Sequence, residues 1–170
     1  MRALLPTVGT VIEALRGEFV DATPPPLGGA VREIEHRPGA DVALDGLFDD
    51  GCPGLVWANV TRIYRTSEFP QEMFGEPCRG PQAAVIQVGA ARCVATIDDR
   101  GFAPTAEAME HDALVGLDDA HRLERAVCLA ARWAEDRGLI DAAVWSPLEP
   151  IGPQGGALAW VMTLTVLLAR

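Results

Sequence analysis

The feature that most limits the possible folds of this chain is an apolar stretch at residues 157–169. Its residues are apolar, β-branched or aromatic, with Thr163 and Thr165 interleaved. A run of this kind predicts a strand that is buried on one face and largely covered on the other. It is shorter than the roughly 20 residues that a membrane helix needs. We therefore expect a core strand here and no membrane span.

The segment before this strand, residues 146–156, is rich in proline and ends with Gln154, Gly155 and Gly156. Proline does not continue a helix, and loops of this composition usually lie at the surface, where partners are met. We predict a presented loop in which Gln154, Gly155 and Gly156 form part of an assembly interface.

Hydrophobic spacing predicts the remaining elements. Apolar positions three and four apart predict a helix over residues 4–20 and a longer helix from about 104 to 137, closed by Gly138. Residues 23–54 have the proline, glycine and acidic content of a long loop, which often contains short strands. β-Branched and aromatic runs predict further strands over three segments: 55–65, 83–97 and 140–145.

The element order α-β-β-α-β-β predicts an α+β fold. We expect a mixed or antiparallel sheet of about four or more strands, packed by two helices, in a single domain over residues 1–170. In the longer helix, the pattern predicts an inward face of Leu114, Leu117, Ala120, Leu123, Val127, Ala131 and Ala134. It predicts an outward face of Asp118, Asp119, Glu124, Glu135 and Asp136.

Residues 66–81 separate two strands that we expect to pair antiparallel. The segment is too long for a tight hairpin and carries Phe69, Met73 and Phe74. Exposed apolar side chains on such an arm are typical of a surface that contacts another molecule. We therefore predict a long hairpin arm and place these three residues in an assembly interface.

The charge argues against tight binding of nucleic acid. The net charge is −10, and all basic residues are arginine. Because phosphate binding needs clustered cations, we expect DNA to be repelled rather than held. The absence of lysine and the abundance of alanine, glycine and proline are typical of a GC-rich coding sequence.

The cysteines and other reactive residues do not form a recognisable catalytic or metal site. No Cys-x-x-Cys pair is present, so we expect unpaired thiols in a reducing compartment at four positions: Cys52, Cys78, Cys93 and Cys128. Cys128 and His121 are two helical turns apart, about 10.5 Å along the axis, and cannot bond directly. His111, between two acidic residues, fits a solvated helix face. Glycine follows Asp49-Asp50 and Asp98-Asp99 closely, which fits turns.

These observations predict no catalytic, cofactor-binding or metal-binding residue, and a protein that is not an enzyme. Residues 152–156 also lack the following lysine and helix of a phosphate-binding loop.

Five segments together resemble the tail terminator proteins of long-tailed siphophages that infect actinobacteria, a family similar to the lambda tail terminator. They are 57–70, 84–93, 98–104, 150–156 and the closing strand with Thr163 and Thr165, and they occur together with the N-terminal helix. The resemblance covers most of the chain, although residues 23–54 are longer than the family leads us to expect.

The resemblance implies a structural virion protein of the tail and neck, assembled in the host cytoplasm. Such a protein forms a hexameric ring on the tail tube protein, stops tube polymerisation and presents a surface to the head-to-tail connector or stopper protein. Genomic DNA would pass through the ring without specific binding, and no membrane is involved. Two alternatives remain open: another head-to-tail neck protein, and a small soluble enzyme or ligand-binding domain.

Overall fold

The computed structural model describes residues 3–39, 44, 47–48, 51–72, 80–97 and 100–169. It shows an α+β fold with two helices and a mixed six-stranded sheet, which confirms the predicted fold class. The elements are, in order, α1 (Leu4–Phe19), β1 (Ile34–His36), β2 (Leu55–Arg65), β3 (Gln82–Cys93), α2 (Ala106–Asp136), β4 (Ile140–Trp145), β5 (Glu149–Gln154) and β6 (Ala157–Leu168).

The sheet has the order β1-β2-β3-β6-β4, with β5 also paired to β6. β1 runs parallel to β2, and all other pairs are antiparallel. β4 and β5 share one side of β6: β4 pairs with its residues 164–168 and β5 with residues 157–161. The predicted strand at 157–169 is therefore an interior strand of the sheet.

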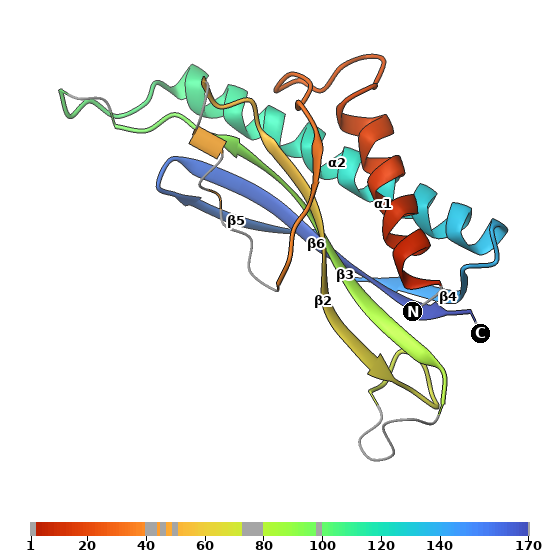
Figure 1. Ribbon diagram of the computed structural model, residues 1–170. Coiled ribbons are helices and arrows are strands. Elements are labelled where there is room, and N and C mark those ends of the chain that lie inside the picture. The colour runs from red at the N-terminus through yellow and green to blue at the C-terminus, as the bar shows by residue number, and fades with distance from the viewer. Residues whose placement is uncertain are drawn as a thin grey trace.

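Both helices cover the same face of the sheet (Figure 1). The main core lies between them and the sheet, and its largest fully buried members include Leu15, Phe19, Ile86, Leu123 and Leu164. Alanines on α2, such as Ala126 and Ala130, let α1 and the sheet approach closely. No helix in the described part of the chain is long and apolar enough to cross a membrane.

The opposite face of the sheet has a smaller core at one end. The indole of Trp57 lies against Gly89, where a Cβ atom would overlap the ring. Leu47 covers this region from the segment before β2 and is fully buried. This part of residues 23–54 is thus packed onto the sheet, and β1 is a short strand within the same long connection.

The predicted inward face of α2 is confirmed at five positions and wrong at two. The five buried residues are Ala120, Leu123, Val127, Ala131 and Ala134. Leu114 and Leu117 are 52% and 59% exposed, whereas Asp119 and Arg122 are buried. A hydrophobic period by itself assigns polar residues to the solvent face. Here buried polar residues find partners: Arg92 pairs with Asp119, and two carbonyls of the loop after α1 accept from Arg122.

The predicted loop at residues 146–156 is wrong in part, because it contains β5. Pro150 and Pro153 donate no backbone hydrogen bond, and a strand with such residues is tolerated at a sheet edge. The pairing of β5 is accordingly irregular between Ile151 and Gln154.

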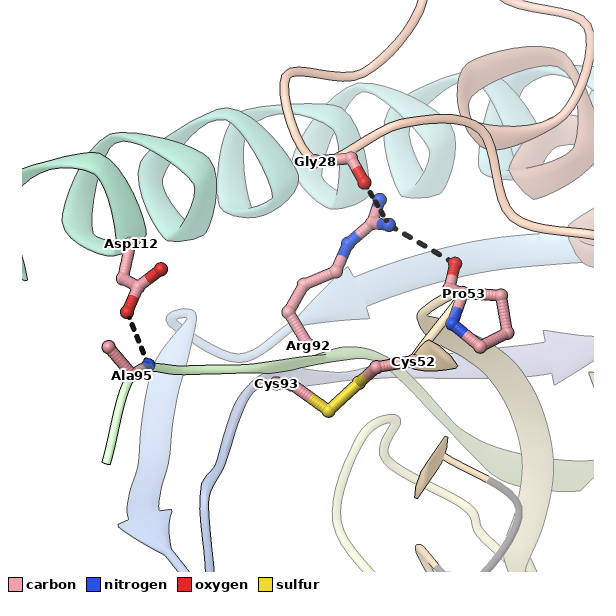
Figure 2. Close-up of a disulfide and its surroundings, with 7 residues drawn as sticks. All are labelled: Gly28, Cys52, Pro53, Arg92, Cys93, Ala95 and Asp112. Carbon is pink, nitrogen blue, oxygen red and sulfur yellow. Dashed lines mark hydrogen bonds between the residues drawn. A yellow bond between two sulfur atoms is a disulfide. The ribbon is translucent and has the colours of Figure 1, made fainter. Parts of the chain in front are cut away.

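The expectation of unpaired thiols is wrong for two cysteines. Cys52 and Cys93 form a disulfide that joins the segment before β2 to the end of β3 (Figure 2). Cys128 is free and exposed on α2, and Cys78 lies outside the described residues.

Candidate assembly surface

An apolar hollow lies at the end of the sheet where β3 ends and β6 begins. We call it the end hollow; its volume is ≈ 660 Å³. Two of the predicted interface residues, Gly155 and Gly156, line it, and Gln154 lies beside them, exposed at the end of β5. Both glycines have positive φ values, 59° and 82°, which the turn between β5 and β6 requires. The other lining residues are Val94, Ala95, Thr96, Ile97, Pro104 and Pro153.

Two hydrogen bonds fix the wall of the end hollow formed by residues 94–97. The Val94 N–H donates to the Gly156 carbonyl at 2.9 Å. The Ala95 N–H donates to the Asp112 carboxylate at 2.7 Å, which ties the wall to α2 (Figure 2). The segment is therefore held in place on both sides although its side chains face outward.

One apolar side chain of the end hollow is strongly exposed: Ile97, which lines it, is 67% exposed. Phe102, two residues before the lining residue Pro104, and Ile151 on β5 are also exposed. In Figure 1, the segment after β3 and the turn before β6 lie at the same end of the molecule. Exposed apolar surface of this kind is typical of a protein-contact site. No sequence signal joined residues 94–104 to the Gly155-Gly156 turn, because only the β3–β6 pairing brings them together.

The predicted arm lies at the opposite end of the sheet. β3 has 12 residues, so the two ends are separated by about 35 Å at 3.2–3.4 Å per residue. Phe69 is half-buried, and the neighbouring Tyr64 hydroxyl donates to the Pro70 carbonyl at 2.6 Å. Met73 and Phe74 lie outside the described residues. Among the described residues, the structure thus places Phe69 far from Gln154, Gly155 and Gly156 rather than bringing them together.

A buried ion pair holds the loops behind the end hollow. Arg92 donates to both carboxylate oxygens of Asp119, at 2.8 and 3.2 Å. Its guanidinium also donates to the carbonyls of Gly28 and Pro53 (Figure 2). A further bond goes to the Gly29 carbonyl. Burial raises the pKa of Asp119, and the hydrogen bonds from Arg92 oppose this shift. Sequence reasoning missed this cluster because it assigned Asp119 to solvent.

A second arginine holds the loop that follows α1. Arg122 donates to the carbonyls of Glu18, Pro24 and Pro25 and to the Asp118 carboxylate. Burial alone would raise the pKa of Asp118. Hydrogen bonds from Arg122 and from the Leu27 N–H outweigh that effect and lower the pKa below its ordinary value. These contacts are structural, because every polar group in them already has a protein partner.

The candidate reactive residues lie apart on the surface. His111, His121 and Cys128 are all exposed on α2. Within the described ranges, no group of three or more His, Cys, Asp or Glu side chains could hold a metal ion. The pairs Asp49-Asp50 and Asp98-Asp99 lie outside the described residues.

No protein-family model and no curated protein matches this chain.

Proposed function

We propose that this protein is a ring-forming tail terminator that caps a phage tail tube and joins it to the head connector. The observation that carries the proposal is the position of the two predicted contact segments at opposite ends of one sheet. A subunit placed between two different axial partners needs a contact surface at each end. We assign one such surface to the end hollow and the other to the arm at residues 66–81.

The charge supports the same proposal. A net charge of −10 repeated around a channel repels phosphate, so DNA can pass without binding. A cyclic ring also needs heterologous contacts, in which one surface of a subunit fits a different surface of its neighbour. No metal or cofactor takes part in this role, and the proposal assigns the protein no enzymatic activity.

The test is to measure the mass of the purified protein and to image it alone and mixed with tail tubes. We expect a hexameric ring that binds one end of a tube and stops its growth. A ring that binds the connector but not the tube would favour another neck protein. A monomer that leaves tube growth unchanged would contradict the proposal and favour a small enzyme or binding domain.

A further inference from the structure

The sheet has two open edges of similar length. β1 pairs with β2 only at residues 56–58, so residues 60–65 form one edge, and β4 forms the other. In the ranges that the structure describes, no strand pairs with the outer side of either. Unpaired backbone groups in an extended strand are a template for another strand.

Hydrogen bonds at the ends of these strands show which backbone groups point outward. On β2, the Thr66 N–H donates to the Pro81 carbonyl. Because bonded and non-bonded pairs alternate along an antiparallel ladder, Ile63 and Arg65 turn their N–H and C=O groups away from β3.

The same alternation applies to β4. The Ser146 N–H donates to the Thr163 carbonyl, so Ala143 and Trp145 turn their backbone groups away from β6. Each edge therefore has two residues, spaced two apart, whose backbone N–H and C=O groups point outward. This is the spacing of hydrogen-bonded pairs in an antiparallel ladder.

Exposed apolar side chains accompany both edges. Ile63 is 49% exposed and Trp145 50%, and the ladder places both on the helix-covered face of the sheet. Val144 is 39% exposed and Tyr64 is half-buried, and both belong to the opposite face. Each face thus has an apolar side chain at either edge.

We propose that β4 of one copy pairs with β2 of the next copy, with Ile63 opposite Trp145 and Tyr64 opposite Val144. The occupant of each edge is a second copy of this chain. β4 runs antiparallel to β6, and β2 and β6 both run antiparallel to β3. β2 and β4 therefore run in opposite directions within one copy. In a ring whose copies all have the same orientation, β4 of one copy and β2 of the next copy are then antiparallel as well. The inference rests on the proposed ring and names the contact that closes it.

The shape and charge beside β4 fit this occupant. A hollow of ≈ 230 Å³ lies beside Trp145, and the neighbouring copy's Ile63 side chain would enter it. Its other lining residues are Glu124, Ser146, Pro147, Leu148 and Met162. Arg65, which the register places opposite Ala143, has the opposite charge to Asp141 on β4. β5 carries Pro150 and Pro153, which protect that edge and limit pairing to β4.

The test is cysteine cross-linking between copies. Cys78 and Cys128 are first replaced with serine to remove background thiols. Tyr64→Cys combined with Val144→Cys should give a ladder of covalent multimers under mild oxidation, up to a closed ring, because directly opposite strand residues lie within disulfide range. The matched control combines Tyr64→Cys with Trp145→Cys, which places the thiols on opposite faces and should give no ladder.

A second variant, Ala143→Pro, removes one outward N–H without touching the bonds between β4 and β6. We expect an unchanged fold by circular dichroism and at least a tenfold loss of rings by native mass spectrometry. If rings assemble but the Tyr64→Cys and Val144→Cys thiols do not cross-link, or if rings persist in the Ala143→Pro variant, the edge contact is overturned. The proposed function would still stand. A protein that stays monomeric even on tail tubes overturns both.

Discussion

Arg92 and Asp119 are among the charged residues buried in a mainly apolar interior. Both are buried, and the Arg92 guanidinium donates to three backbone carbonyls as well as to the carboxylate. A buried pair of this kind adds little stability over apolar residues of the same size, but removal of one partner leaves a charge without compensation. The pair therefore fixes where the loops at Gly28 and Pro53 lie.

We predict that Asp119→Leu lowers the free energy of unfolding by about 3–5 kcal/mol, because Arg92 stays buried without its partner. Urea unfolding measures the loss. Adding Arg92→Met should cost less than the sum of the single changes, by roughly 0.5–3 kcal/mol. Glu135→Gln, an exposed change on the same helix, is the control. Additive effects of the two changes would contradict the pairing.

Asp118 should make folding sensitive to acid. Its pKa in the folded protein is lowered, chiefly by the Arg122 hydrogen bond acting against burial. The carboxylate therefore contributes stability above the unfolded pKa of about 3.9, and this contribution is lost as pH falls through the lower folded pKa. We expect Asp118→Asn to melt below the wild type at pH 6 and closer to it at pH 3. A constant gap across that range would contradict the assignment.

At the scale of the element, α2 shows what sequence pattern can and cannot predict. Its ends were predictable, since Thr105 caps the first turn by accepting from the Ala108 N–H and Gly138 follows the last turn with φ 64°. Its inward face was predictable at most positions, such as Leu123 and Val127, which are buried. It was not predictable at Leu117 and Asp119, because the burial of Asp119 depends on Arg92, which lies on a distant strand.

β5 and the disulfide were missed for different physical reasons. Prolines disfavour a strand locally, but β6 offers an edge that tolerates them. Cys52 and Cys93 are 41 positions apart, and no spacing rule links them. Only the packing of the long connection onto the end of β3 brings their sulfur atoms together.

The disulfide should hold that connection against the Trp57 side of the sheet. We expect Cys52→Ser to lower the free energy of unfolding by about 2–4 kcal/mol, because a long loop is no longer closed in the unfolded chain. Limited proteolysis should then cut near residues 51–54 faster than in the wild type. Cys128→Ser is the matched control, because this thiol is exposed and free. Equal cleavage in both variants would show that packing alone holds the segment.

At the scale of the whole molecule, the fold class followed from the order of helices and strands, while the surfaces depended on sheet order. The sequence indicated Gly155 and Gly156 as presented residues, and the structure places them at the end hollow. It could not indicate that residues 60–65 of β2 and strand β4 lie at open edges of the sheet. A strand pattern shows which residues face the core, whereas the neighbours of a strand are set by long-range pairing.

The last prediction separates a residue of the interior strand β6 from an exposed residue at the end of β5. Val166 is fully buried in the interior strand β6, so Val166→Asp places a carboxylate without a partner in the core and should unfold the subunit. Gln154 is exposed at the end of β5, so Gln154→Ala should change the melting temperature little but reduce assembly on tail tubes. Melting curves and electron micrographs of the two variants measure both effects. A folded Val166→Asp protein, or normal tube capping by Gln154→Ala, would show that the interior strand or the presented turn has been assigned wrongly.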